Sequence, residues 1–164
     1  MAGYGSYKRG GETMSTDQDV ARFLQNPSID QLKQNPALID KVGDKLGSFC
    51  VEKKLGEHQL RRIHERLLAL YYRSKKLVVK QVYEAGLDKG LNTELVRLKY
   101  FIAYQWSRLG RDKGKDYFEP FMKLVDQVKD FEAIEKLLYL SEAVVAYYNY
   151  HEEISKRMGG GYRR

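Results

Sequence analysis

Apolar residues recur three and four positions apart through most of the chain, with polar residues between them. This spacing is typical of helices that bury one face. The predicted helices open at Ser15, Ser28 and Asn35 and then cover about 57–84, 93–109, 116–129 and 131–157. No stretch shows the alternation with a period of two that marks a strand. The pattern therefore predicts an all-α fold, a compact bundle of five or six helices.

Polar residues between the apolar segments supply the expected helix starts. Asn92 is expected to cap the helix that follows it. Asp116 and Glu119 form a capping box for the next helix, and that start leaves Pro120 in the first turn, where proline is tolerated. The segment 110–115 between these two helices is then expected to be a flexible loop.

The chain divides into one folded domain and two tails. Residues 14–157 carry the helical pattern and are expected to form a single bundle. Residues 1–13 and 158–164 contain glycines interleaved with tyrosine and basic residues, and neither segment has an apolar period, so both are predicted to be disordered. Such tails can also contact RNA weakly through arginine and tyrosine.

Composition narrows the class of protein. The chain has 164 residues, of which 43% are hydrophobic and 31% charged, close to the averages for globular domains. Cys50 is the single cysteine, so no intramolecular disulfide can form. No apolar run has the length of a signal peptide core or a membrane span. We therefore expect a soluble cytoplasmic protein.

The net charge of +7 is concentrated in short segments. Residues 53–83 contain nine Lys or Arg against two Asp or Glu, whereas residues 116–142 are net acidic. Basic character of this kind favours a polyanionic partner.

Five basic residues form one row along the longest predicted helix. At about 100° per residue they fall within a sector about 80° wide, roughly opposite the apolar face, and the row is about 27 Å long. The residues are Arg62, Arg66, Arg73, Lys76 and Lys80. No Asp or Glu separates these like charges on that face, although their repulsion is unfavourable. The row suits the phosphates of a nucleic acid strand, and a solvated helix face is the alternative.

A second face combines arginines with aromatic rings. Arg97, Phe101, Tyr104 and Arg108 fall on one side of the helix at 93–109. Arginine binds phosphate and aromatic rings stack on bases, so this face also suits RNA. The alternative is that the rings pack under another helix or at a subunit contact.

The loop predicted at 110–115 adds Arg111 and Lys113 as possible phosphate contacts. It is similar to a nucleotide-binding loop only superficially, because it lacks the Ser or Thr after the lysine and follows a helix instead of a strand. Nucleotide hydrolysis is not expected.

The sequence shows no set of residues with a catalytic or metal-binding spacing. His58 and His64 do not share a helix face, and His151 has no zinc-motif neighbour. Cys50 lies beside Phe49 on an apolar face and is expected in the core. We therefore expect no enzymatic activity, no metal and no cofactor.

Three segments resemble signatures of a known family. Residues 55–63 (LGEHQLRRI) are similar to the helix-opening signature of the small subunit of type III-A (Csm) CRISPR interference complexes. Residues 98–108 resemble its tyrosine-bearing helix that ends in arginine, and residues 140–148 (LSEAVVAYY) its C-terminal helix. Gly56 departs from the family, which often has Ser or Thr near that cap. The resemblance covers about 55–150.

The resemblance implies a small, helical, non-catalytic subunit that stacks in several copies beside the repeated backbone subunits and the large subunit. Such a subunit contacts guide RNA and single-stranded target RNA without reading sequence, and the other subunits carry the chemistry. Arg61 or Arg62, together with Arg108, match the family's RNA contacts, and the helical wheel favours Arg62.

Three alternatives stay open at this point. The small subunit of a type III-B (Cmr) complex shares the helical design. A helix-turn-helix DNA regulator is a different class, but its basic residues would gather at the start of a short recognition helix. A structural adaptor would dock the acidic segment 116–142 on a basic partner, and the same segment could pair with a basic segment of another copy.

Overall fold

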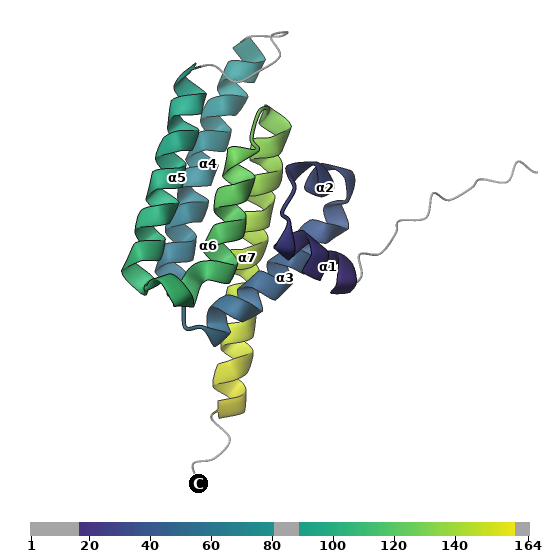
Figure 1. Cartoon of the computed structure of the whole chain (residues 1–164), viewed down its shortest axis with the longest axis vertical. Coiled ribbons are helices and arrows are strands. Elements are labelled where there is room, and N and C mark those ends of the chain that lie inside the picture. Colours follow the sequence, from purple (N-terminus) through teal and green to yellow (C-terminus); the bar gives the residue numbers. More distant parts are fainter. Residues whose placement is uncertain (1–16, 81–88, 160–164) are drawn as a thin grey trace, which may run out of the picture.

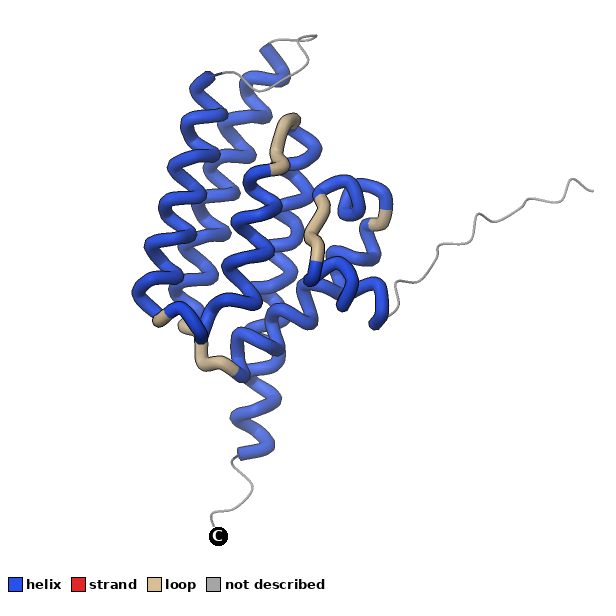
Figure 2. The backbone as a smooth tube through the Cα atoms, in the orientation of Figure 1, coloured by secondary structure: helices blue, strands red, loops and turns tan. Residues whose placement is uncertain are grey.

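The computed structural model describes residues 17–80 and 89–159, and every helix and loop below belongs to that part of the chain. It contains seven helices and no strand within these ranges. The helices are α1 (Asp17–Gln25), α2 (Ile29–Gln34), α3 (Pro36–Glu52), α4 (Glu57–Lys80), α5 (Lys89–Leu109), α6 (Arg111–Asp126) and α7 (Phe131–Gly159). Short loops join most of them (Figure 2). The all-α prediction is confirmed.

The predicted total of five or six helices is too low, because each of the three candidate starts in the N-terminal segment opens a separate helix. Pro27 follows the end of α1 closely, and Pro36 opens α3 directly after α2. A residue before proline disfavours the helical conformation, so each proline ends the preceding helix.

Helices α4, α5, α6 and α7 run side by side with alternating direction (Figure 1). Helix α3 crosses α7 at an angle, and α1 and α2 lie against α3 and α7. The last part of α7 extends beyond the other helices of the bundle (Figure 1). This arrangement leaves α4 and α5 together on one outer side.

One hydrophobic core runs through the described part of the chain. From α4 it takes Leu60, Ile63, Leu67 and Leu70, which lie three or four positions apart and so share one face of the helix. Aromatic residues of α6, among them Phe118 and Phe121, are buried where α6 packs against α5 and α3. Burying each such side chain contributes about 1.5–3 kcal/mol, so the core fixes which face of α4 and α5 remains outside.

The crossing of α3 and α7 depends on two glycines. A Cβ added at Gly43 would lie 2.5 Å from Ala143 Cβ, and one added at Gly47 would lie 2.7 Å from Tyr147 Cβ. Carbon atoms normally approach no closer than about 3.5 Å, so only glycine allows the two helices this distance. Tyr147 Oη also donates a hydrogen bond of 2.5 Å to Asp40 at this crossing.

The predicted starts of two helices are wrong. Helix α5 begins at Lys89, so Asn92 lies inside it and is not its cap. Helix α6 begins at Arg111, because Gly110 adopts a φ of 84° that turns the chain into a new helix. The segment predicted as a flexible loop is therefore the first turns of α6, and Pro120 lies in the helix interior.

Some predictions fall outside the described residues. These are the disordered N-terminal tail at 1–13, most of the C-terminal tail at 158–164, and the end of the longest helix near 84. The last helix extends to Gly159, two residues beyond its predicted end. Among the described residues, no helix combines the length and apolar character that crossing a membrane requires.

Candidate nucleic-acid interface

The basic row predicted at residues 62–80 lies at the surface of α4. Arg62, Arg66, Arg73 and Lys76 are all exposed, while Ser74 and the apolar residues of the opposite face are buried. Lys80 ends α4, and its side chain lies outside the described residues. The helix geometry therefore places four of the five predicted cations in one line facing solvent.

Contacts between α4 and α5 join this row to the aromatic face predicted on α5. The guanidinium carbon of Arg66 lies 4.0 Å from the centroid of the Phe101 ring. One turn or more away, Arg73 Nη1 lies 3.4 Å from Glu94 Oε1, and Arg97 Nη1 lies 3.4 Å from the same oxygen. The two predicted faces thus form one continuous surface, which we call the α4–α5 face.

The aromatic rings of α5 differ in their accessibility. Phe101 is half-buried under Arg66, so its ring has the packing role that was the alternative interpretation. Tyr104 is 57% exposed, and Arg108 lies 5.9 Å from its ring centroid. Tyr100, which the sequence interpretation did not select, is 69% exposed. Tyr100 precedes Tyr104 by four residues, and this spacing, which places both on the same side of α5, could have identified it from the sequence.

Carboxylates neutralise part of this face. Glu94 faces both Arg73 and Arg97, and Glu57 holds Arg61 through a hydrogen bond of 2.6 Å from Nε. Exposed ion pairs of this kind contribute at most about 1 kcal/mol, so a polyanion can replace them.

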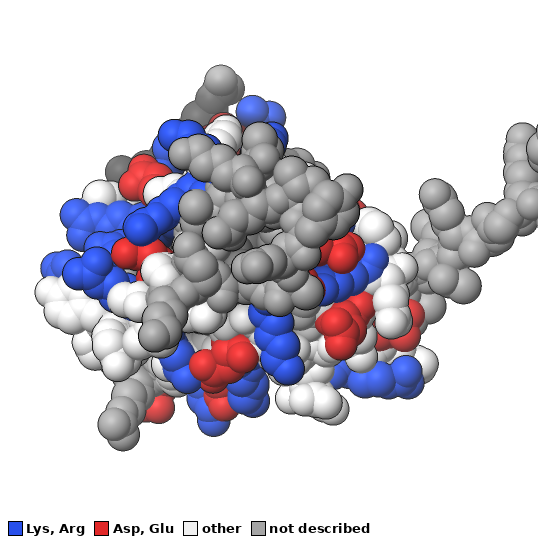
Figure 3. Space-filling model, turned by 90° about the horizontal axis from the view of Figure 1, so that it is seen from above, with Lys and Arg blue, Asp and Glu red and all other residues white. Residues whose placement is uncertain are grey.

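Other cations of the face have no such partner. No carboxylate in the described ranges lies within ion-pair distance of Arg62, Arg66 or Lys76. Arg66 instead stacks on a ring, which leaves its outer edge available for hydrogen bonds. Seen from above, Lys and Arg side chains gather on the side of the molecule where α4 and α5 lie, with few carboxylates between them (Figure 3).

A shallow hollow of about 200 Å³ separates the two helices of the face. Arg66 and Arg73 line it from α4, and Glu94 and Leu98 line it from α5. A hollow bordered by arginines suits a flexible, charged chain better than a small substrate held from all sides.

The remaining predicted site residues lie near the ends of the face or beyond it. Arg108 is exposed at the end of α5, which lies beside the start of α4 because the two helices are antiparallel. Lys113 is exposed in the first turn of α6, and the side chain of Arg111 lies outside the described residues. Lys113 is therefore held on a helix and does not belong to a mobile basic loop.

The histidines and the cysteine are spread over separate places. His64 Nδ1 lies 2.9 Å from the Ser141 hydroxyl, and His151 Nε2 lies 2.6 Å from Asp44 Oδ1. Cys50 is fully buried, and this burial raises the pKa of its thiol, which confirms the predicted core position. The described residues contain no cluster of three or more His, Cys, Asp or Glu side chains that could hold a metal.

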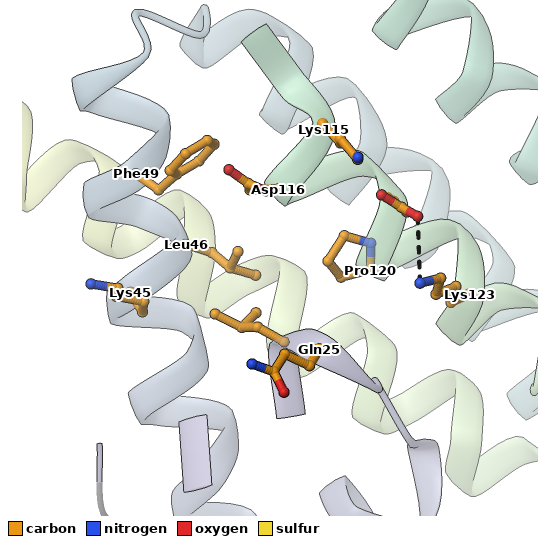
Figure 4. A pocket seen from close by; sticks show the side chains of 10 residues that line it. Gln25, Lys45, Leu46, Phe49, Lys115, Asp116, Pro120 and Lys123 are labelled. Atoms are coloured by element: carbon orange, nitrogen blue, oxygen red, sulfur yellow. Dashed lines mark ion pairs between the residues drawn. The ribbon is translucent and has the colours of Figure 1, made fainter. Parts of the chain in front are cut away.

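A larger cavity, about 320 Å³, lies between α1, α3 and α6 (Figure 4). Leu46, Phe49 and Pro120 form its apolar floor, and lysines stand at its rim, where Lys123 pairs with Glu119 at 3.4 Å. Its charged lining residues are Asp116, Glu119 and three lysines, and it contains no His, Cys or Ser.

Comparison with known families places the chain in one of them. The profile of the family described as Csm2 Type III-A matches residues 33–153, which include α3 to α6 and most of α7. The match extends further toward the N-terminus than the resemblance seen at 55–150, and it favours type III-A over the type III-B alternative. Neither the curated proteins nor the solved structures gave a match. The chain belongs to the Csm2 Type III-A family and is a small structural subunit of a type III-A CRISPR complex.

Proposed function

We propose that this subunit binds guide and target RNA through the α4–α5 face, without sequence preference and without catalytic activity. The observation that carries the proposal is the line of exposed cations on α4, of which Arg62, Arg66 and Lys76 have no carboxylate partner in the described ranges. Such a line favours phosphates, whose spacing is regular and independent of base identity. A subunit of this kind acts in the cytoplasm, where the complex meets its target.

The α5 side of the face supports the same function. Arg97 and Arg108 are exposed there, so cations flank the α4 row along its length. Several cations along one rigid helix hold phosphates without the entropy loss of ordering a loop.

Self-association between copies belongs to this proposal, but the acidic segment 116–142 supports it weakly. Asp126 accepts two hydrogen bonds from Lys99, at 2.6 and 2.7 Å, and Asp130 accepts one from Lys33 at 2.8 Å. Part of the negative charge is thus neutralised within the chain. Copies that stack side by side along an RNA would associate mainly because they share the same strand.

The experiment compares RNA affinity between two double variants. Arg62→Gln with Lys76→Gln removes two unpaired cations of the face, and both side chains are exposed, so the fold is retained. Lys41→Gln with Lys45→Gln removes the same charge from exposed positions of α3, away from α4 and α5 (Figure 1). Affinity for a fluorescent single-stranded RNA is measured by anisotropy at several salt concentrations.

The first variant is expected to bind more weakly. Its negative slope of log affinity against log salt should become less steep by about 1.4, since each phosphate contact on a single strand contributes about 0.7. The control variant should behave like the unmodified protein. Equal losses in both variants would mean that net charge, not the α4–α5 face, governs binding. Tighter binding to duplex DNA than to RNA would support the DNA regulator instead.

A further inference from the structure

A line of exposed apolar and aromatic side chains runs along the outside of α5. Val96, Tyr100 and Tyr104 follow one another at intervals of four residues and are 48%, 69% and 57% exposed. Residues four apart on a helix lie on the same side, so these three side chains form one stripe. Large aromatic surface is costly to leave in water, which makes a stripe of this kind a binding surface.

The stripe faces away from the bundle. The buried residues Leu95, Leu98 and Ile102 lie on the opposite side of α5. Phe101 turns toward α4, where Arg66 covers it. Within the described ranges neither Tyr100 nor Tyr104 packs against another aromatic ring, and both side chains are more than half exposed.

The charges around the stripe indicate the chemistry of that partner. Arg97 lies between the stripe and α4, and Arg108 stands over the ring of Tyr104. Helix α5 contains a single carboxylate, Glu94, and it points toward Arg73 of α4. Aromatic rings beside exposed arginines, of which Arg97 shares Glu94 with Arg73, suit a ligand with flat π-systems and negative charge, which is the chemistry of an unpaired nucleic acid strand.

We propose that Tyr100 and Tyr104 stack on unpaired bases of RNA whose phosphates lie on the α4 row. This inference rests on the proposed function and adds that the subunit prefers single strands to duplexes. The two tyrosines are about 6 Å apart along the helix axis, nearly twice the ~3.4 Å rise between neighbouring bases of one strand. Each tyrosine ring therefore stacks on a different base, or the two rings stack on opposite faces of one base that lies between them.

Stacking on the two tyrosines should make the face bind single strands more tightly than duplexes. A duplex presents phosphates in the same way but keeps its bases paired and stacked inside, so it can use the arginines and lysines but not the rings. The face would hold the target strand most firmly where it is unpaired.

The experiment measures affinity for three ligands of equal length: a single-stranded RNA, a strand without bases, and a blunt RNA duplex. The unmodified protein is expected to bind the base-bearing strand at least about fivefold more tightly than the strand without bases, because one stacked base contributes that much or more. Tyr100→Leu with Tyr104→Leu should remove this difference and leave binding of the strand without bases unchanged. Tyr100→Phe with Tyr104→Phe should preserve it.

Tyr150→Leu is the matched control, since Tyr150 is 58% exposed on α7 and should have no effect. The stacking proposal is overturned if the leucine double variant, folded by circular dichroism, keeps the preference for bases. It is also overturned if that variant loses only association with a second copy or another subunit, which would make the stripe a protein contact. Absence of binding to every ligand by the unmodified protein would overturn the proposed function as well.

Discussion

The crossing of α3 and α7 gives the sharpest test of the packing. Gly43→Ala adds one methyl group that would lie 2.5 Å from Ala143 Cβ, whereas ordinary carbon contacts are about 3.5–4.0 Å. The helices would have to separate by about 1 Å. Neither side can yield easily, because the opposing atoms belong to a short side chain and to helix backbone.

The cost can be estimated from two opposing effects. Overpacking of this size destabilises a core by about 1–3 kcal/mol. Alanine is a better helix former than glycine by about 1 kcal/mol, which offsets part of that cost. We therefore expect a net loss of up to about 2 kcal/mol in the free energy of unfolding, which lowers the urea midpoint by up to roughly 1 M.

A size exchange isolates the contact from the general effect of glycine and alanine. Ala143→Gly alone should also destabilise, by about 1 kcal/mol from helix propensity. In the variant carrying both Gly43→Ala and Ala143→Gly, the propensity effects cancel and the nearest remaining Ala143 atoms are its backbone carbons at 3.3 and 3.4 Å. Its stability should approach that of the unmodified protein, a coupling of about 1–3 kcal/mol.

Urea unfolding followed by circular dichroism gives the free energy of unfolding of the unmodified protein, the two single variants and the double variant. Gly159→Ala serves as the control, because an added Cβ there meets nothing within 4 Å. The packing argument is refuted if Gly43→Ala raises the midpoint, or if the two substitutions simply add in the double variant.

Three further predictions concern other positions. Gln105 is 1% exposed and neither atom of its amide finds a partner in the described ranges, so Gln105→Met should raise the free energy of unfolding by about 1 kcal/mol, and a lower urea midpoint would contradict this. Cys50 should react with a thiol reagent only after unfolding, because it is buried and its pKa is raised; rapid labelling of the native protein would show that α3 opens. Burial raises the pKa of Asp130, but hydrogen bonds from Lys33 and the Ala133 N–H outweigh it and bring the pKa below its usual 3.8. The stability from this carboxylate is present above about pH 4 and lost as the pH falls further, so Asp130→Asn should reduce the difference in urea midpoint between pH 7 and pH 3.

The faces of the long helices were predictable because they depend on local spacing alone. The intervals among Leu60, Ile63 and Leu67 assign the buried side of α4, and the opposite side then carries the arginines. The same spacing holds for Leu95, Leu98 and Ile102, which are buried on α5.

Helix starts were less predictable where several local signals compete. Asp116 and Glu119 form a plausible capping box, yet the positive φ of Gly110 starts α6 earlier, and the helix accommodates Pro120 in its interior. Pro120 is buried there and lines the cavity between α1, α3 and α6, and it has no N–H to donate a backbone hydrogen bond.

The joining of the two basic faces could not be predicted from spacing. The stacking of Arg66 on Phe101 and the shared Glu94 exist only because α4 and α5 pack side by side in antiparallel register. That pairing also turned Phe101 inward and left Tyr100 outside. Candidate contacts on single helices therefore became one surface only in the folded chain.

The most direct test of the central claim is the salt dependence of RNA binding by the unmodified protein. If the α4–α5 face holds about five phosphates of a single strand, log affinity should fall with log salt at a slope of about −3 to −4. Two unrelated sequences of equal length should give the same line. An affinity that does not change with salt, or one that depends strongly on sequence, would contradict the account.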